Sequence, residues 1–217
     1  AYEILGRDWS SDVCSSDLGQ GYVVFGKANS APVDLAALGA GGFRINGIGH
    51  RDLAGRSVSG AGDVNGDGLG DVIVGAPGAH AAGGGPGSES YVVFGKASVT
   101  PVDLEAIGSG GFRIDGSGDY VYSGISVSGA GDINGDGLAD LIVGSPNADP
   151  GGNASAGESY VVFGKASNTP VDLGALGASG FRMDGIDVGD LSGFSVSGAG
   201  DVNGDGLADV IVGAYAA

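Results

Sequence analysis

The feature that most constrains this fold is an internal repeat with a fixed period of 69 residues. Three segments recur at this spacing, and they begin at these positions: YVVFGKA at Tyr22, Tyr91 and Tyr160, GFR at Gly42, Gly111 and Gly180, and SVSGAGD at Ser57, Ser126 and Ser195. A constant period indicates tandem copies of one supersecondary unit, each of which buries its apolar face against its neighbours. We therefore expect a repeat architecture without a domain boundary inside the repeated region.

The pattern within one repeat predicts short strands. The predicted strands of one period span residues 57–63, 71–77, 90–95 and 111–115. The first alternates small residues and places Val58 inward, and the second is an apolar run closed by Gly and Pro, typical of a strand buried on both faces. The third is rich in aromatic and β-branched residues, and the fourth alternates apolar with polar positions. Residues 32–42, and the copies of this segment that begin at Pro101 and Pro170, have room for one helical turn. Asp34 would cap this turn in the first copy.

Four antiparallel strands in tandem predict an all-β fold, a β-propeller in which each repeat forms one blade. No segment has the pattern of a helix long enough to cover a parallel sheet. A linear β-solenoid is the alternative, although its rungs are usually much shorter than this repeat. The expected divisions are a half blade at 19–56, blades at 57–125 and 126–194, and a half blade at 195–217. Because these amount to three blades and a ring needs roughly four to eight, we expect an incomplete ring and a longer parent protein.

The first eighteen residues differ from everything that follows. They contain the only Trp and the only Cys of the chain, Trp9 and Cys14. The segment has neither the basic start nor the apolar centre of a signal peptide. It resembles the in-frame translation of a sequencing-library adapter, which makes residues 1–18 an artefact, the alternative being a disordered natural N-terminus. We expect the natural sequence to begin near Gly19 and no export signal to be present in this fragment.

The chain is strongly acidic. It carries 26 Asp and Glu against 9 Lys and Arg, a formal net charge of −17. This balance disfavours nucleic acid and anionic membranes as partners and favours cations. No apolar run approaches the roughly 18 residues of a membrane span. A single Cys and two His leave no basis for a disulfide framework or a Cys- or His-based zinc site.

An acidic loop follows the first predicted strand of each repeat. Its oxygen donors stand at positions 1, 3, 5 and 9, and a backbone carbonyl is available at position 7. In order, these residues are Asp63, Asn65, Asp67, Leu69 and Asp71 in the first loop, Asp132, Asn134, Asp136, Leu138 and Asp140 in the second, and Asp201, Asn203, Asp205, Leu207 and Asp209 in the third. Gly at positions 4 and 6 permits the tight curl that would bring these oxygens together. Hard cations with six to eight oxygen ligands suit this set, so we expect one Ca²⁺ per repeat and three in the chain.

Two other interpretations of the loop fit its sequence less well. The start, DxNxDG, matches an EF-hand loop, but position 12 is Val74, Val143 or Val212 inside a predicted strand, where an EF-hand carries a bidentate Glu. A plain hairpin turn is the second alternative, because Asn-Gly and Asp-Gly are strong hairpin signals. A bare turn does not require three acids at fixed offsets in three copies, and crowded carboxylates without a cation repel one another. The pattern therefore favours a calcium loop on a β-hairpin.

With these motifs the repeats resemble FG-GAP repeats, which form the blades of the integrin α-subunit propeller and of propellers in many bacterial secreted proteins. FG lies in each VVFG segment, and the GAP position reads GAP at Gly75–Pro77, GSP at Gly144–Pro146 and GAY at Gly213–Tyr215. The resemblance covers residues 19–217. It implies a propeller, usually of seven blades, with calcium loops on one face and ligand-contacting loops on the other.

The loops on that other face are predicted to carry recognition, because they differ between copies while the strands hardly change. They span residues 47–56, 76–88, 116–124, 145–157 and 185–193, with Tyr120, Tyr122, Asp119, Asp187 and Asp190 as candidate contacts. Asn153 begins a glycosylation sequon. We expect a non-enzymatic, calcium-binding propeller of a secreted or cell-surface protein that serves adhesion or binds an extracellular protein or glycan. The alternative is an accessory module of an extracellular calcium-dependent hydrolase or lyase.

Overall fold

The computed structural model describes residues 18–79, 87–118 and 121–217, and these parts of the chain are built from strands and short 3₁₀ turns. The strands are β1 (Gln20–Val24), β2 (Gly42–Asn46), β3 (Ser57–Gly62), β4 (Asp71–Ala76), β5 (Glu89–Val93), β6 (Val102–Asp103), β7 (Gly111–Asp115), β8 (Ser126–Gly131), β9 (Asp140–Ser145), β10 (Glu158–Val162), β11 (Val171–Asp172), β12 (Gly180–Asp184), β13 (Ser192–Gly200) and β14 (Asp209–Ala214). The 3₁₀ turns are η1 (Leu35–Ala37), η2 (Gly39–Gly41), η3 (Leu104–Ala106), η4 (Gly108–Gly110), η5 (Pro150–Gly152), η6 (Leu173–Ala175) and η7 (Gly177–Ser179). In these ranges no helix is long and apolar enough to cross a membrane.

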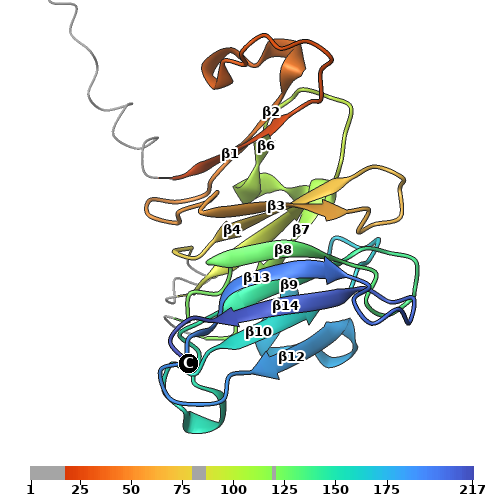
Figure 1. Ribbon diagram of the computed structural model, residues 1–217. Coiled ribbons are helices and arrows are strands. Elements are labelled where there is room, and N and C mark those ends of the chain that lie inside the picture. Colours follow the sequence, from red (N-terminus) through yellow and green to blue (C-terminus); the bar gives the residue numbers. More distant parts are fainter. Residues whose placement is uncertain (1–17, 80–86, 119–120) are drawn as a thin grey trace, which may run out of the picture.

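The strands form antiparallel sheets that lie against one another in chain order (Figure 1). Two sheets have the expected four antiparallel strands, β3-β4-β5-β7 and β8-β9-β10-β12. Before them lies the pair β1–β2 and after them the pair β13–β14. The innermost strands β3, β8 and β13 pack side by side. This confirms the all-β prediction of tandem four-stranded sheets, consistent with a propeller fragment whose ring is not closed within the chain.

Each full repeat also carries a two-residue strand that the sequence did not predict. β6 pairs in parallel with β2, and β11 pairs in parallel with β7. In both cases the short strand belongs to one repeat and extends the sheet of the preceding repeat. The outermost strand of one sheet is thus hydrogen-bonded to the following repeat, which ties neighbouring sheets together at their outer edges.

The helical turn expected near Asp34 is present as η1. The Asp34 carboxylate accepts a hydrogen bond from the amide of Ala36 at 2.9 Å, so it caps the turn as predicted. The same cap recurs at Asp103 and Asp172 in the later repeats. Gly ends each turn within one or two residues, and a second 3₁₀ turn then leads into the fourth strand.

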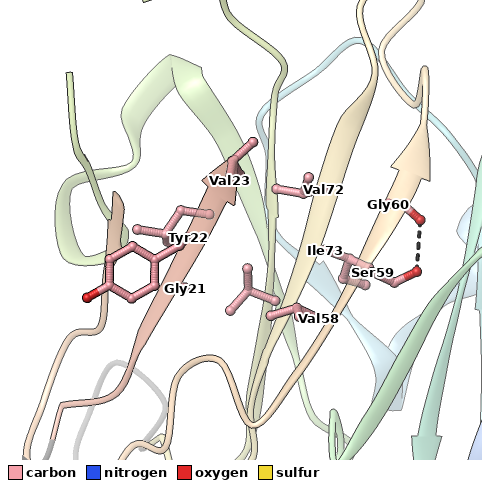
Figure 2. A pocket seen from close by; sticks show the side chains of 10 residues that line it. Gly21, Tyr22, Val23, Val58, Ser59, Gly60, Val72 and Ile73 are labelled. Atoms are coloured by element: carbon pink, nitrogen blue, oxygen red, sulfur yellow. Dashed lines mark hydrogen bonds between the residues drawn. The ribbon is translucent and has the colours of Figure 1, made fainter. Parts of the chain in front are cut away.

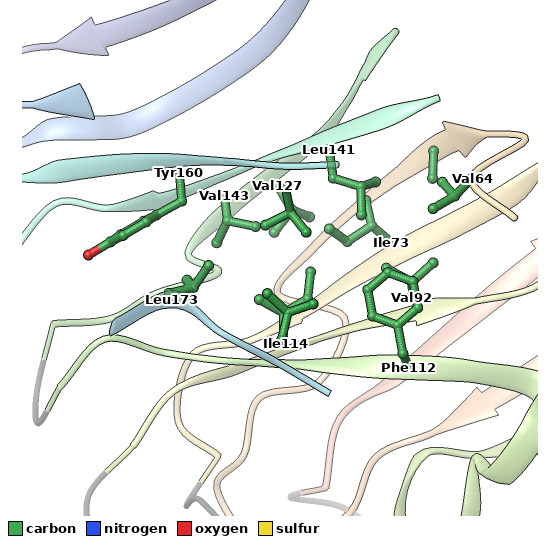
Figure 3. Packing of buried hydrophobic residues seen from close by; sticks show 13 residues of the cluster. Val64, Ile73, Val92, Phe112, Ile114, Val127, Leu141, Val143, Tyr160 and Leu173 are labelled. Atoms are coloured by element: carbon green, nitrogen blue, oxygen red, sulfur yellow. The ribbon is translucent and has the colours of Figure 1, made fainter. Parts of the chain in front are cut away.

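The main core lies between the two four-stranded sheets (Figure 3). Ile73 and Val92 of one sheet meet Val127 and Leu141 of the next, and all four side chains are buried. Phe112, on the fourth strand of its sheet, closes the outer side of this core and stacks edge-to-face on Phe94 with 6.1 Å between ring centroids. The repeat therefore buries its apolar residues against the neighbouring repeat rather than within one sheet.

The prediction that Val58 faces inward is wrong for this copy of the repeat. Val58 is 60% exposed, whereas the matching Val127 and Val196 are each 6% exposed. The direction of the side chain follows the strand pattern, but no first or second strand of a preceding sheet covers β3 among the described residues. Burial in this fold depends on the neighbouring repeat, which a strand pattern cannot report.

Candidate metal centre

The three acidic loops connect the first and second strands of their sheets and lie at one end of the molecule (Figure 1). They join β3 to β4, β8 to β9, and β13 to β14. The described linkers between sheets and between second and third strands leave the opposite end of the strands. The sequence prediction of which loops share an end therefore agrees with the topology.

The first loop curls around the carboxylate of Asp63. One carboxylate oxygen of Asp63, Oδ1, accepts hydrogen bonds from the amides of Gly66 at 2.8 Å and Asp67 at 3.1 Å. The other, Oδ2, accepts from Gly68 at 2.9 Å. Gly66 and Gly68 have φ values of 77° and 85°, a region that L side chains rarely adopt. The two glycines thus allow the loop to fold back onto its first acid.

Asn65 and Asp67 lie inside the same curl. The Asn65 side-chain oxygen accepts from the Asp67 amide at 2.8 Å, and its Nδ2 donates to Asp67 Oδ2 at 3.0 Å. Asp67 Oδ1 accepts from the amide of Leu69 at 2.8 Å. The donors at positions 1, 3 and 5 are therefore held by successive amides of one short loop.

Asp71 closes the loop from the first residue of β4. Its Oδ2 accepts from the amide of Val64 at 2.9 Å, and its Oδ1 accepts from the amide of Gly95 at 2.7 Å. The residue is 2% exposed. Asp71 therefore fastens the loop to β4 and to the segment after β5, a structural role in addition to the ligand role predicted from sequence.

Burial raises the pKa of the Asp71 carboxyl above its usual range, and the carboxylates of Asp67 and Asp63 act in the same direction. The amides of Gly95 and Val64 oppose the rise in pKa by stabilising the charged form. Burial likewise raises the pKa of Asp140 in the second loop. A cation beside these groups would relieve the crowding of negative charge that the loop creates.

The second and third loops repeat these contacts. Asp132 and Asp201 each accept from three loop amides at 2.6–3.1 Å, as Asp63 does. Asp140 accepts from Ile133 at 2.8 Å and Gly164 at 2.8 Å. Asp209 accepts from Val202 at 2.7 Å, and the described residues after β14, 215–217, include no third strand whose following Gly could supply the second donor. The third loop is the most exposed of the three.

Adjacent loops are joined directly. The backbone oxygen of Asp63 accepts from the amide of Ala139 at 3.0 Å, and that of Asp132 accepts from Ala208 at 3.0 Å. Leu138 lies against Gly66 of the preceding loop, close enough for its Cδ2 to stand 3.1 Å from a Cβ placed on that glycine. The conformations of adjacent loops are therefore coupled through a backbone hydrogen bond and a packed side chain.

The donor chemistry of the loops suits an oxygen-preferring cation. Each loop holds three carboxylates and one amide oxygen, and a carboxylate that accepts two or three hydrogen bonds keeps lone pairs for a metal. As the side chains lie, no three Asp, Glu, His or Cys groups of the described ranges converge to hold an ion. The loops thus place oxygen donors on a tight curl, with the carboxylates turned onto their own backbone amides.

At the opposite end, Asp190 is not available as a surface contact. It is 8% exposed, and its Oδ2 accepts from the amide of Asp187 at 2.9 Å, which stabilises the linker before β13. Asp187 and Tyr122 are exposed. Asp119 and Tyr120 lie outside the described residues. Asp190 is therefore a structural residue of the loop, whereas the predicted recognition role of the exposed side chains stays a prediction.

The structure also contains a polar cluster on β5 and β7 that the sequence did not predict. Tyr91 stands opposite Arg113 on β5 and β7, and Glu89 stands opposite Asp115, so the four side chains share one face. The Tyr91 hydroxyl donates to Glu89, and Arg113 bridges Glu89, at 3.6 Å, and Asp115. Glu158, Tyr160, Arg182 and Asp184 repeat the arrangement. The sequence does contain a signal for this cluster. A Glu and a Tyr two residues apart, and an Arg and an Asp two residues apart, both recur with the repeat period.

We expect Glu89→Gln to stabilise the protein at pH values above the raised pKa of Glu89. Burial raises the pKa of Glu89 above its ordinary value of 4.5, so the folded state holds the proton more tightly than the unfolded state. The stability this group contributes is therefore full below that ordinary value and is lost as the pH rises through the raised pKa. Gln is an accepted substitute, because Gln20 takes the same position in the first repeat and accepts from Tyr22 at 2.8 Å. Melting temperatures of both proteins between acid and alkaline pH measure the effect, and an equal pH slope for the two contradicts it.

Comparison with known proteins agrees with the repeat structure. The family described as FG-GAP repeat matches residues 54–93, 123–162 and 192–217. Integrin alpha pat-2 of Caenorhabditis elegans is 33% identical over 175 residues, which is 76% of this chain and 14% of the relative. Human integrin alpha-IIb is 32% identical over 162 residues, which is 71% of this chain and 14% of the relative. The phosphatidylinositol-glycan-specific phospholipase D of mouse is 36% identical over 106 residues, which is 47% of this chain and 12% of that protein.

The fold and the three matches define a class, a β-propeller fragment built of tandem four-stranded blades. The chain belongs to the FG-GAP repeat family and is homologous to integrin α-chains. It spans only 12–14% of the length of the relatives it matches.

Proposed function

We propose that this chain is a calcium-stabilised, non-catalytic propeller scaffold of a secreted or cell-surface protein. The observation that carries the proposal is the triplicate loop, in which Asp, Asn and Asp stand at alternate positions of one curl that a further Asp closes, and this closing Asp is buried in the first two copies. A hairpin needs no such set of acids, and the same loop in three copies would leave nine carboxylates near one end of an already acidic protein.

The side chains at positions 1, 3, 5 and 9 of each loop would hold the ion, together with the carbonyl of the Leu at position 7. Bound Ca²⁺ supplies positive charge that offsets the carboxylates and cross-links the two ends of the loop. In the two complete blades the closing Asp transmits this order to the rest of the blade, because it is hydrogen-bonded to the segment after the third strand. The backbone bonds between adjacent loops extend the effect from blade to blade.

The melting temperature is expected to rise with Ca²⁺ and to fall on chelation, because a ligand that binds only the folded state stabilises it by mass action. Calcium at 100 times its Kd would add about 2.7 kcal/mol per independent site. Thermal unfolding followed by circular dichroism, with EDTA and with added Ca²⁺, measures the shift.

Asp136→Ala is the matched variant for this test, because Asp136 is an exposed loop residue whose removal abolishes the middle site. Glu105→Ala removes the same charge from an exposed position outside the loops and serves as the control. We expect Asp136→Ala to lose part of the calcium-induced shift and Glu105→Ala to keep all of it. An identical melting curve with EDTA and with Ca²⁺ would contradict the proposal.

For the end opposite the calcium loops we propose a binding role toward an extracellular protein or glycan. The exposed residues Tyr122, Asp187 and Val188 lie in the linkers there, and those linkers differ between copies while the strands are nearly constant. Protein and glycan arrays probed with this chain test the role. Binding that disappears when residues 185–193 are exchanged for residues 47–56 supports it, and a blank array in the presence of Ca²⁺ opposes it.

A second candidate is an accessory propeller module of an extracellular hydrolase or lyase. The match to phosphatidylinositol-glycan-specific phospholipase D favours this candidate, since that enzyme carries similar repeats. On this proposal the chain itself is not catalytic. Phospholipase assays of the chain alone are expected to show no turnover, whereas turnover that survives purification would assign catalysis to the repeats themselves.

A further inference from the structure

A cavity of about 430 Å³ lies where three successive repeats meet. Its lining residues come from the linker after β2, from β5, from η3, from β7 and from the segment before β11. Ligand pockets in proteins commonly have volumes of about 300–1,000 Å³, so the cavity has room for a small ligand. None of its lining residues belongs to an acidic loop.

A second hollow, the apolar groove of Figure 2, differs from this cavity in its chemistry. Tyr22 and Val23 of β1 line the groove together with Val58, Val72 and Ile73 of β3 and β4, and no charged side chain lines it. An apolar lining alone selects no particular ligand. The cavity between the three repeats combines apolar walls with ionised groups, which is the usual character of a specific binding site.

The polar end of the cavity is formed by Glu89, Tyr91 and Arg113. The residues Glu89 and Tyr91 are buried, at 2% and 3% exposure. The Tyr91 hydroxyl donates to Oε2 of Glu89, and Arg113 stands 3.6 Å from Oε1 of Glu89 and is ion-paired with Asp115. Oε1 of Glu89 accepts no hydrogen bond from the described part of the chain. A buried carboxylate oxygen without a donor loses free energy on folding, so a donor supplied by a ligand would be bound favourably there.

The cavity wall has acceptors to spare, whereas its donors are directed at acceptors of the chain itself. The Tyr91 hydroxyl proton is given to Glu89, and Arg113 is held in its ion pairs. Nδ2 of Asn168 donates to the carbonyl oxygen of Gly108 at 3.0 Å. Oε1 of Glu89 and the side-chain oxygen of Asn168 remain as acceptors. A ligand that pairs with this wall must therefore bring hydrogen-bond donors.

The charge around the cavity favours a cation. Glu89 and Glu105 line the cavity together with Arg113. Burial raises the pKa of Glu89, and the carboxylates of Asp115 and Asp52 act in the same direction, while Arg113 opposes them. These four carboxylates outnumber the one guanidinium. A positive charge in the cavity therefore gains electrostatic energy, and an anion is repelled.

The arrangement of acceptors favours an ammonium over a guanidinium. A guanidinium pairs best with both oxygens of one carboxylate, but Oε2 of Glu89 already accepts from the Tyr91 hydroxyl. The compact ammonium of a primary amine has three donors that can reach separate acceptors. Apolar walls formed by Ile48, Leu104 and Ile107 suit an aliphatic stem attached to that ammonium.

The equivalent cluster of the next repeat is completed by the chain itself. Glu158 and Tyr160 form the same hydrogen-bonded pair. Ser117 stands there at the position of Ile48, and its hydroxyl is hydrogen-bonded to Tyr160. A glycine takes the position of Glu105, so one carboxylate is missing. The acidic, partly apolar cavity is therefore a property of the middle repeat and not of every copy.

We infer that the cavity beside Glu89 binds a primary ammonium group carried on an aliphatic stem, with Glu89 as its anionic partner. Two sources share this chemistry, a free alkylamine and the lysine side chain of a partner protein. The inference goes beyond the calcium-stabilised scaffold proposed above. Because the cavity and the acidic loops have no residue in common, either one can fail without the other.

Methyl NMR of the full chain tests the inference, with n-butylammonium chloride as the probe and sodium chloride at equal ionic strength as the blank. We expect saturable shifts of the Ile48 and Leu104 methyl resonances, because both side chains line the cavity. Glu89→Gln is expected to raise the dissociation constant at least about tenfold, since it removes a charge-assisted hydrogen bond. The variant keeps its fold, as Gln20 occupies this position in the first repeat. Glu158→Gln, the same change in the next repeat, is expected to leave the dissociation constant unchanged.

The absence of any saturable shift would overturn the inference, as would equal affinity in wild type and Glu89→Gln. n-Butanol has the same stem without the charge, and tetramethylammonium has the charge without an N–H donor. Both are expected to bind at least about tenfold more weakly than n-butylammonium. Equal affinity for n-butanol would contradict the inference, because the cavity would then select only for apolar surface.

A further probe distinguishes the two sources of the ammonium. Nα-acetyl-lysine methylamide presents the same ammonium and stem as a side chain on a peptide backbone. Tighter binding of this probe than of n-butylammonium supports the inference with a protein lysine as the ligand. Weaker binding supports it with a free alkylamine as the ligand.

Discussion

Phe112→Ala is expected to lower the free energy of unfolding by about 3–5 kcal/mol, the range for truncating a buried Phe to Ala. Phe112 is 1% exposed and lies in the core between the two four-stranded sheets. It contacts Phe94, and the ammonium of Lys165 from the next repeat lies 4.4 Å from its ring centroid. Removing the ring leaves a cavity walled by two repeats, which cannot collapse without moving one sheet relative to the other.

Phe181→Ala is the matched control, since it makes the same change at the same position of the next repeat. Phe181 keeps its edge-to-face neighbour Phe163 at 6.2 Å but is 40% exposed. Less apolar area is lost and no closed cavity forms, so we expect a cost of about 1–2 kcal/mol. Both substitutions are compared by urea denaturation. Equal costs at the two positions would show that contacts between repeats do not carry the stability.

Asp140→Ala is expected to cost about 2–3 kcal/mol in the presence of EDTA. The Asp140 carboxylate is fully buried and accepts from the amides of Ile133 and Gly164, both of which lose their acceptor. Removal of a buried carboxylate whose pKa is raised by burial offsets part of this cost. The chelator matters because it separates the structural role of Asp140 from its proposed role as a metal ligand.

Asp209→Ala provides the contrast for this prediction. Asp209 is the equivalent residue of the third loop, but it is only half-buried and accepts from the single amide of Val202. Water can take over that amide, so the expected cost is below about 1 kcal/mol. Urea denaturation of both variants measures the difference. A cost at Asp209 equal to that at Asp140 would mean that the loop, rather than its link to the third strand, determines the stability.

The sequence predicted the strands and loops well because both have a local signal that is repeated three times. Alternation and β-branched runs located β3, β4, β5 and β7, and the Asp34 cap located η1. A period of 69 residues turned each local signal into three independent observations. The all-β, four-stranded architecture followed from these elements alone.

The sequence could not predict features that depend on the neighbouring repeat. β6 and β11 are strands only because the edge of the preceding sheet lies beside them, and Val33, in the same sequence context, is not in a strand. Val58 is exposed for the same reason, although its strand pattern equals that of Val127. Asp190 looked like a surface acid, yet its side chain folds back onto its own linker. For β6, β11 and Val58 the deciding partner is distant in sequence, whereas the partner of Asp190 is the amide of Asp187 in the same linker.

Calcium titration by isothermal calorimetry tests the central claim most directly. The three loops predict three Ca²⁺ per chain, with dissociation constants of roughly 10⁻⁴–10⁻³ M, the range of extracellular calcium modules. Asp136→Ala is predicted to reduce the stoichiometry to two, while Glu105→Ala leaves it at three. A titration that shows no calcium binding would contradict the assignment of these loops as the metal centres of the propeller. An unchanged stoichiometry in Asp136→Ala would contradict it as well.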